Sequence, residues 1–263
     1  LEDVKVFLNQ LYEKLSERKG EISLDQRKEK IEKIHAEIQK HRKKLDEHLA
    51  DPSVPMNPAH VPATCQEVFP KDTIFVYDGG NSVIWSNFYM KLEKPGSVLS
   101  TFKFGMLGAG PGQALGAASS KENQPVCCII GDGAMGFHPQ EIETAVRNNL
   151  PVVFVVMCDK QWGMVKMNQS FALKPLKTLV KKSLSPEETI NTDLGEIRFD
   201  KLAESMGAHG EYVNNKEDLK AALERALQTG KCAVIHVDVD PVKHMWAPGL
   251  KYFKDMHLEP KGK

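Results

Sequence analysis

The chain has 263 residues, of which 41% are hydrophobic and 27% are charged, a composition that excludes wholesale disorder. Lysine plus arginine and aspartate plus glutamate both number 35, so the formal net charge is zero. This balance argues against a protein that neutralises a nucleic-acid backbone. The apolar runs fall short of the roughly 20 residues that cross a bilayer. We therefore expect neither a nucleic-acid partner nor a membrane partner.

The five cysteines, Cys65, Cys127, Cys128, Cys158 and Cys232, show no metal-binding spacing. Four of them lie in or beside apolar runs, where a thiol packs as a small hydrophobic group. The first residues of the chain also lack the basic and apolar regions of a signal peptide. Together these features predict a reducing, cytoplasmic setting.

The first fifty residues have the pattern of helices. Apolar residues recur at helical spacing between positions 4 and 15, and again as a narrow stripe on the highly charged segment 24–49. Prolines interrupt this pattern between residues 51 and 58. We therefore interpret residues 1–50 as the helical tail and linker of a preceding central domain, and residues 51–263 as a second domain. Since the chain starts inside a helical pattern at Leu1, we expect it to be part of a longer protein.

Beyond the prolines, short apolar runs alternate with helical patterns. Runs that are apolar throughout are typical of strands buried on both faces of a parallel sheet. The sequence therefore predicts an α/β fold, a parallel sheet with helices on both faces. The predicted strands are Thr73–Tyr77, Val126–Ile130, Val152–Met157 and Ala233–Val239, and the predicted helices are Gly112–Ser119, Pro139–Asn149, Phe199–Met206 and Lys216–Gln228. We interpret the lysine-rich stretch 174–197 as a long loop or lid.

Two carboxylates follow two of the predicted strands. Asp132 lies in Gly131-Asp132-Gly133 after one strand, and Asp159 follows the next strand, 27 positions later. This separation suits one strand–helix–strand unit, so both side chains should lie at neighbouring strand ends, where open α/β sheets bind ligands. Two carboxylates with nearby backbone oxygens form a hard oxygen site suited to Mg²⁺ and a phosphate-bearing ligand. Either feature alone is more often a turn or a helix cap, but both in this register are rare.

These residues resemble a known motif. Gly131-Asp132-Gly133, the helix 140–151, the strand Val152–Met157 and the pair Cys158-Asp159 are similar to the Gly-Asp-Gly to Asn-Asn motif of thiamine-diphosphate-dependent enzymes. The resemblance is to the carboxyl-terminal, diphosphate-binding domain of the acetolactate synthase-like group, and it covers roughly residues 55 to 250. It implies the thiamine diphosphate-binding fold and two cofactors, thiamine diphosphate and Mg²⁺. Residues 1 to 50 are similar to the end of that group's central domain.

The resemblance implies roles for individual residues. Asp132 and Asp159 would bind Mg²⁺ through their side chains, and Gln161 through its main-chain carbonyl. Gly131 completes the glycine turn, and Leu107 stands where a bulky apolar residue supports the bent cofactor. The remaining residues expected to contact the cofactor are Asn81, Ser82, Met106, Gly133, Ala134, Gly163 and Met164.

Three features depart from the family's pattern. Cys158 and Asp159 replace the two asparagines, which adds a negative charge to the metal site, and Ala134 lacks a hydroxyl that many members place against the phosphate. The glutamate that protonates the cofactor's aminopyrimidine lies in a separate domain in this family, and nothing in the chain resembles that domain. We therefore assign no catalytic residue to this chain, and we expect it to be inactive in isolation.

The function that the resemblance implies is that of a carboligase, which joins a pyruvate-derived two-carbon unit to a carbonyl acceptor. Its expected partners are a 2-oxo acid substrate and a pyrimidine-binding domain of the same or another subunit, within a homodimer or homotetramer. Three alternatives stay open. The chain is a subunit of a 2-oxo acid decarboxylase, a non-catalytic homologue of the same fold, or a dinucleotide-binding domain. The last is disfavoured because the segment Gly108–Gln113 lacks the third glycine of that motif.

Two further segments contain histidines that could serve a site. His138 follows the Gly-Asp-Gly turn, where it either faces a substrate or, more commonly at a helix start, bonds to the backbone. His244, Trp246 and Pro248 follow the last strand, where they either close over a site and exclude water or simply pack on the sheet.

Overall fold

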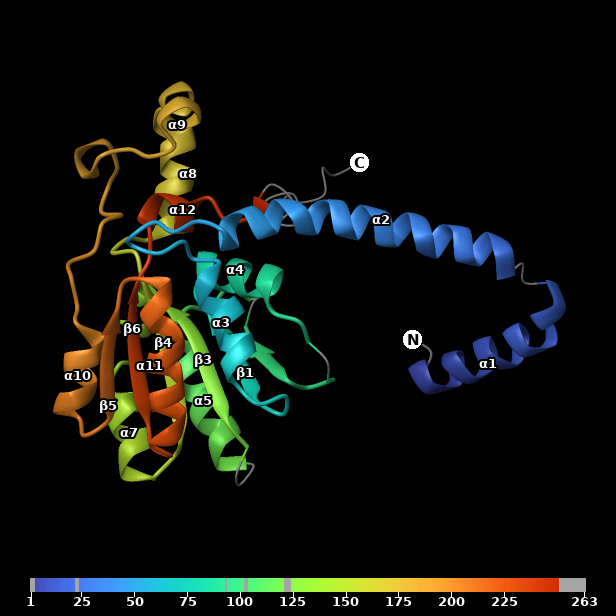
Figure 1. Ribbon diagram of the computed structural model, residues 1–263, viewed down its shortest axis with the longest axis horizontal. Coiled ribbons are helices and arrows are strands. Elements are labelled where there is room, and N and C mark those ends of the chain that lie inside the picture. Colours follow the sequence, from blue (N-terminus) through green and yellow to red (C-terminus); the bar gives the residue numbers. More distant parts are fainter. Residues whose placement is uncertain (1–2, 22–23, 93, 102–103, 121–123, 251–263) are drawn as a thin grey trace. The chain divides into compact units, whose positions relative to one another are not determined.

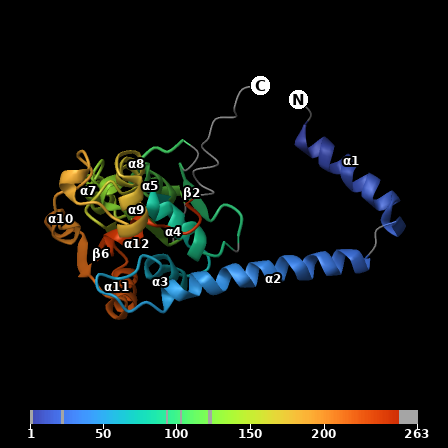
Figure 2. The same ribbon diagram turned by 90° about the horizontal axis from the view of Figure 1, so that it is seen from above.

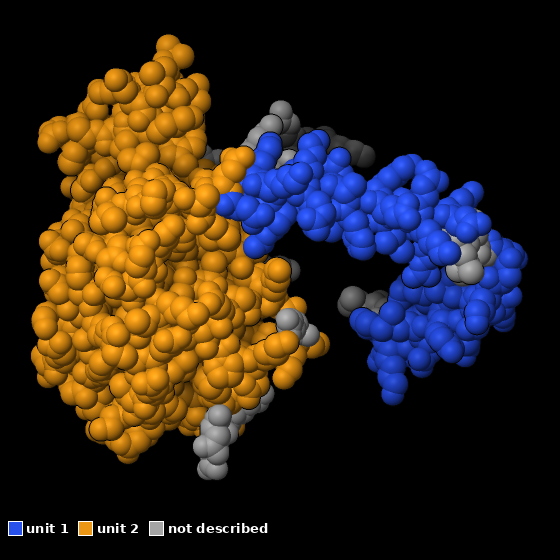
Figure 3. All heavy atoms as spheres, viewed as in Figure 1, with its two compact units in different colours: residues 1–46 blue, residues 47–263 orange. Residues whose placement is uncertain are grey.

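A computed structural model describes residues 3–21, 24–92, 94–101, 104–120 and 124–250 (Figure 1). The chain divides into two compact units, residues 1–46 and 47–263 (Figure 3). This division falls a few residues before the boundary predicted from the prolines. Among the described residues, we find no helix with both the length and the apolar character needed to cross a membrane.

The first unit is helical, as predicted. Helix α1 (Val4–Glu17) begins after Asp3, whose side chain accepts hydrogen bonds from two backbone amides of the first turn, and a short 3₁₀ turn follows it at Lys19–Glu21. Helix α2 (Leu24–Leu49) runs on into the second unit. No residue of α1 is buried, and its apolar side chains are among the exposed ones.

The second unit is built on one parallel sheet of six strands, in the order β2-β1-β3-β4-β6-β5. The strands are β1 (Ile74–Asp78), β2 (Val98–Ser100), β3 (Val126–Gly131), β4 (Val152–Cys158), β5 (His209–Val213) and β6 (Ala233–Asp238). The four predicted strands are the central ones, and the predicted α/β fold is confirmed. The two strands missed by the sequence prediction, β2 and β5, form the edges, where partly exposed residues replace the continuous apolar run.

Helices cover both faces of the sheet, because alternate side chains of each strand point to opposite sides. Phe75, Cys127 and Val155 face the side of α3 (His60–Val68) and α11 (Lys216–Gln228). Val76, Cys128 and Phe154 face the side of α5 (Ala109–Ser120), α7 (Glu141–Arg147) and α10 (Phe199–Ser205). Figure 2 shows α3 and α11 on the side opposite to α5 and α7.

The remaining helices lie near the carboxyl ends of the strands. They are α4 (Asn81–Tyr89), α6 (Asp132–Met135), α8 (Gly163–Leu173), α9 (Pro175–Lys181) and α12 (Pro241–Met245). The prediction that 174–197 is a loop was wrong for its first part, because α9 and a 3₁₀ turn at Pro186–Glu188 occupy it. Thr178 of α9 is fully buried and donates a hydrogen bond to the Ser170 carbonyl of α8. Packing on α8 therefore orders a segment whose own pattern has no clear period.

The residues of the predicted boundary are part of the second unit. The Asp51 carboxylate accepts a hydrogen bond from Nδ2 of Asn57 at 3.0 Å and forms an ion pair with Lys243 at 2.6 Å. The Met56 amide donates to the Asn214 carbonyl, and the Met56 carbonyl accepts from Asp240. Segment 51–56 is thus anchored to the loops that flank β5 and β6.

The strand order locates one crevice in the sheet. From β1 the chain moves to β2 on one side, whereas β3 lies on the other side of β1 and leads on to β4. The direction of winding therefore changes between β1 and β3. In open α/β sheets, ligands bind outside the carboxyl ends of the strands at such a point.

Candidate functional site

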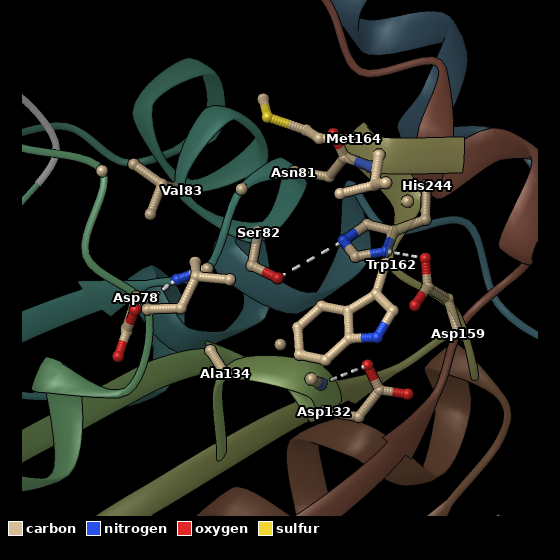
Figure 4. Close-up of a pocket in the computed structure, with 18 of the residues that line it drawn as sticks. Asp78, Asn81, Ser82, Val83, Asp132, Ala134, Asp159, Trp162, Met164 and His244 are labelled. Atoms are coloured by element: carbon tan, nitrogen blue, oxygen red, sulfur yellow. Dashed lines mark hydrogen bonds and ion pairs between the residues drawn. The ribbon is translucent and has the colours of Figure 1, made fainter. Parts of the chain in front are cut away.

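An open cavity lies at this switch point, with about 950 Å³ of empty space that includes its mouth (Figure 4). Its walls come from the segments that follow β1, β3 and β4, the loop before α5, and α12. All the residues expected to contact the cofactor or metal line it: Asn81, Ser82, Met106, Leu107, Gly131, Asp132, Gly133, Ala134, Asp159, Gln161, Gly163 and Met164. The structure therefore brings the predicted residues together, while their individual roles stay predictions.

Asp132 begins α6 directly after β3. Its Oδ1 accepts a hydrogen bond from the Gly133 amide and its Oδ2 from the Lys160 amide, both at 2.7 Å. Lys160, which donates the second of these hydrogen bonds, has a left-handed backbone with φ 57°. Burial, and then the charge of Asp159, raise the pKa of Asp132 to about 7. The two carboxylates therefore lie close enough to repel each other.

Asp159 is buried and follows β4 directly. Its Oδ2 is 2.7 Å from Nδ1 of His244 and accepts a weaker hydrogen bond from Nε2 of Gln161 at 3.3 Å. Among the hydrogen bonds of the described residues, none ends on Oδ1 of Asp159. Figure 4 shows Asp159 and Asp132 on the same wall of the cavity, one above the other.

Gln161 uses its side chain for structure. Its Nε2 donates to the Pro241 carbonyl at the start of α12 at 2.8 Å. Within the described part of the chain, no hydrogen bond ends on its main-chain oxygen. The described residues also contain no group of three His, Cys, Asp or Glu side chains that could hold a metal. A cation bound by both carboxylates would therefore need a neutral oxygen such as this carbonyl.

The opposite wall is formed by the start of α4. Asn81 and Ser82 are buried, and Asn81 Oδ1 has no hydrogen-bond partner within the part of the chain that the structure describes. A Cβ at Gly163 would lie only 2.5 Å from Nδ2 of Asn81, so a larger residue where α8 meets α4 would force the Asn81 side chain to shift. Both helices begin at the cavity, and helix amino ends carry free amides and a partial positive charge.

The loop before α5 forms the apolar wall of the cavity. Leu107 is partly buried and packs against the core, whereas Met106 is 47% exposed. Gly108 has φ 84° and its carbonyl is 2.8 Å from Nδ1 of His138. His138 thus bonds to the backbone, as expected for a histidine at this position.

Three cavity residues outside the predicted set, Asp78, Trp162 and His244, make contacts that shape the site. Asp78 is buried at the end of β1, and its carboxylate accepts the amides of Gly79 at 2.6 Å and Gly110 at 2.7 Å. It thereby ties β1 to the start of α5, and burial raises its pKa. Its position in Tyr77-Asp78-Gly79, after a buried strand, was the same signal that singled out Asp132.

Trp162 is the second of these residues. Its indole lies against Gly133, where a Cβ would come within 2.6 Å of the ring, and it packs near Phe137 at 5.9 Å between ring centroids. The indole also lines a second cavity, of about 830 Å³, which contains Cys158 and His236. The thiol of Cys158 is 3.6 Å from Nδ1 of His236 and therefore does not face the first cavity.

His244 was singled out from the sequence, but its contact with Asp159 was not predicted. The segment after β6 was expected either to close over a site or to pack on the sheet. The structure separates its residues: His244 enters the cavity and contacts Asp159, whereas Trp246 donates to the Lys182 carbonyl at 2.6 Å and packs on Phe171.

Comparisons with known proteins show which family the chain belongs to. Residues 78–237 match the family of the thiamine pyrophosphate enzyme, C-terminal TPP binding domain. The chain belongs to this family. Thiamine diphosphate is therefore confirmed as the family's cofactor, with Mg²⁺ as its usual ion, and the dinucleotide-binding alternative is disfavoured further.

Several individual proteins are similar to this chain. An acetolactate synthase large subunit from Mycobacterium tuberculosis is 34% identical over 193 residues, which cover 73% of this chain and 33% of that protein. A sulfoacetaldehyde acetyltransferase from Alcaligenes xylosoxydans xylosoxydans is 30% identical over 186 residues, or 69% of this chain and 29% of that protein.

Among solved structures, a thiamine diphosphate-dependent 4-hydroxybenzoylformate decarboxylase from Rhodococcus jostii is similar with a TM-score of 0.57 at 26% identity. The match covers 70% of this chain and 33% of that one. The chain spans about a third of the length of these relatives.

Proposed function

We propose that residues 51–263 form the diphosphate- and Mg²⁺-binding domain of a thiamine-diphosphate-dependent carboligase of the acetolactate synthase-like group. The reaction would join a pyruvate-derived two-carbon unit to a carbonyl acceptor. The observation that carries the proposal is the meeting of Asp132 and Asp159 in one cavity at the switch point of the sheet. Residues 1–50 would be the helical end of a preceding central domain and its linker.

The oxygen atoms at this wall fit Mg²⁺. The two carboxylates repel each other in a buried setting, and a divalent cation between them would relieve that repulsion. Oδ1 of Asp159 and the main-chain oxygen of Gln161 have no other partner among the hydrogen bonds of the described residues. Asp132, Asp159 and Gln161 would therefore hold the metal.

The opposite wall fits a diphosphate. The helices α4 and α8 both begin at the cavity, so their first amides favour an anion. Asn81 and Ser82 on this wall, together with Gly133 and Ala134 next to Asp132, would contact the phosphate groups, and Gly163 lets α8 approach Asn81. Ala134 would contribute only its backbone amide.

The apolar wall fits the rings of the cofactor. Thiamine diphosphate, when bound, supplies the nucleophilic carbon that attacks the carbonyl of a 2-oxo acid. Leu107 would support the rings from below, with Met106 and Met164 at the sides of the cavity. These residues provide shape and exclude water, and they carry no proton.

Turnover would need a group that this chain does not provide. The glutamate of the pyrimidine-binding domain would come from the same or another subunit of a homodimer or homotetramer, so we propose that this chain alone is inactive. A second candidate function, 2-oxo acid decarboxylation, is favoured by the similarity to the Rhodococcus jostii enzyme. All five cysteines are free and buried, which supports the prediction of a reducing, cytoplasmic setting.

The proposal is tested by calorimetry on the full-length protein. We expect thiamine diphosphate to bind in the presence of Mg²⁺ and to bind much more weakly with a chelator. Asp132→Ala should abolish the Mg²⁺ dependence, whereas Glu143→Ala, on the exposed face of α7, should leave it unchanged. Unchanged affinity in Asp132→Ala would refute the metal assignment. Absence of Mg²⁺-dependent binding in the unmodified protein would favour the non-catalytic homologue.

A further inference from the structure

The side chain of His244 reaches the proposed metal site from a segment 85 residues beyond Asp159. We propose that His244 is a positioning residue that makes Asp159 a one-oxygen metal ligand. This inference rests on the proposed function, because it concerns the same metal.

The two carboxylate oxygens of Asp159 have different surroundings. Oδ2 lies 2.7 Å from Nδ1 of His244 and accepts a hydrogen bond from Nε2 of Gln161 at 3.3 Å. Oδ1 has no such partner among the described residues, and Figure 4 shows one carboxylate oxygen directed to His244 and the other toward the interior of the cavity. Because a carboxylate oxygen accepts and never donates when ionised, Nδ1 of His244 must carry the hydrogen. Oδ2 is thereby occupied, and Oδ1 is left for a cation.

His244 is itself held rigidly. It is 3% exposed, and its carbonyl accepts a hydrogen bond from the indole nitrogen of Trp85 at 3.0 Å. Its Nε2 lies 3.4 Å from Oγ of Ser82 on the opposite wall. The helix that carries it, α12, is capped by Asp240, whose side chain accepts hydrogen bonds from two backbone amides of the first turn, both at 2.9 Å. Gln161 adds a further link to the same helix through the Pro241 carbonyl.

The hydrogen bonds to Oδ2 affect both the charge of Asp159 and the way in which it can bind a metal. A free carboxylate can bind a metal through one or both oxygens and can rotate between them, whereas an amide side chain offers one oxygen. The hydrogen bonds to Oδ2 prevent Asp159 from binding a metal through both oxygens. They also stabilise its negative charge through two donors. Hydrogen bonds that orient a metal ligand commonly change metal affinity by about 10–100-fold when they are removed.

The test compares two amide substitutions of His244 in the full-length protein. The side-chain nitrogen of asparagine falls near Nδ1 of histidine, and that of glutamine falls near Nε2. We expect His244→Gln to weaken Mg²⁺ binding, measured by calorimetry at saturating thiamine diphosphate, by about 10-fold or more. His244→Asn keeps a donor near the position of Nδ1, so its Mg²⁺ affinity should stay within about threefold of that of the unmodified protein.

A double-mutant cycle separates positioning from packing. In the Asp159→Asn background, which needs no donor to a second carboxylate oxygen, His244→Gln should have little further effect on Mg²⁺ affinity. An equal loss in both backgrounds would overturn the proposal, and so would unchanged affinity in His244→Gln. Thermal unfolding without ligands reports whether the variants fold.

A second variant keeps the test decisive if His244→Gln does not fold. Gln161→Met removes the other donor to Oδ2 while it keeps the main-chain oxygen. We expect this change to weaken Mg²⁺ binding only when Asp159 is present, and a loss that persists in Asp159→Asn would contradict the proposal. If the unmodified protein shows no Mg²⁺-dependent cofactor binding, the proposed function fails. If it binds normally and the cycle shows no coupling, only the role of His244 fails.

Discussion

The glycines of α5 provide the sharpest prediction about how this site is built. Gly110 lies against Asp78 at the end of β1, and a Cβ at this position would be 2.7 Å from the Asp78 Cβ and 2.9 Å from its Oδ2. In the same helix, Gly116 is exposed and a Cβ there would meet nothing within 4 Å. The same substitution, glycine to alanine, should therefore have opposite effects at the two positions.

The magnitude follows from these contacts. Carbon atoms normally approach to about 3.5–4.0 Å, so the alanine at 110 requires a shift of roughly 1 Å. Asp78 cannot yield easily, because two backbone amides hold its carboxylate at 2.6 and 2.7 Å. Overpacking of this kind costs about 1–3 kcal/mol, and weakening the Gly110 hydrogen bond costs about 1 kcal/mol more. The following Pro111 adds a bias against helical backbone for any residue with a Cβ.

The assay is thermal unfolding of the two variants beside the unmodified chain. For a chain of this size, 1 kcal/mol shifts the midpoint by about 2–4 °C. Gly110→Ala should therefore lower Tm by roughly 8 °C. Gly116→Ala should raise the free energy of unfolding by about 0.4–1 kcal/mol, because alanine reduces the freedom of the unfolded chain. A Tm for Gly110→Ala equal to that of Gly116→Ala would refute the contact between α5 and Asp78.

Three further predictions concern the cavity, the domain edge and the core. Gly163→Ala should weaken thiamine diphosphate binding in calorimetry, because the new Cβ displaces Asn81. Asp51→Asn should lower the free energy of unfolding by about 1 kcal/mol at pH 7. Hydrogen bonds from Asn57 and then from Lys243 hold the Asp51 pKa below its usual range, so the stability difference measured by urea unfolding should shrink as the pH falls below 3.8. Phe154→Ala, at a fully buried position, should cost about 3–5 kcal/mol in urea unfolding.

Each of these has a contradicting outcome. Normal cofactor affinity in Gly163→Ala would show that Asn81 is not part of the diphosphate wall. For Asp51, stability lost by an equal amount at every pH would indicate a packing effect, since a carboxylate with a lowered pKa contributes only while it is ionised. A cost below about 1 kcal/mol for Phe154→Ala would mean that this face of the sheet is loosely packed.

The sequence alone determined the centre of the fold and much of the site. The central strands were predictable because strands buried on both faces need continuous apolar runs, and such runs stand out against charged helices. The placement of Asp132 and Asp159 at neighbouring strand ends was predictable because each follows such a run directly, at the separation of one strand–helix–strand unit.

Only the tertiary structure decided the rest. The edge strands β2 and β5 and the helix α9 depend on neighbours that are distant in sequence, so their own residues lack a clear pattern. The same holds for His244, whose bond to Asp159 spans 85 positions and leaves no mark on local periodicity. The local sequence decides which residues end a strand, but the geometry of the candidate site arises where separate segments meet. The pairing of His244 with Asp159 exists only because the folded sheet brings the ends of β4 and β6 side by side.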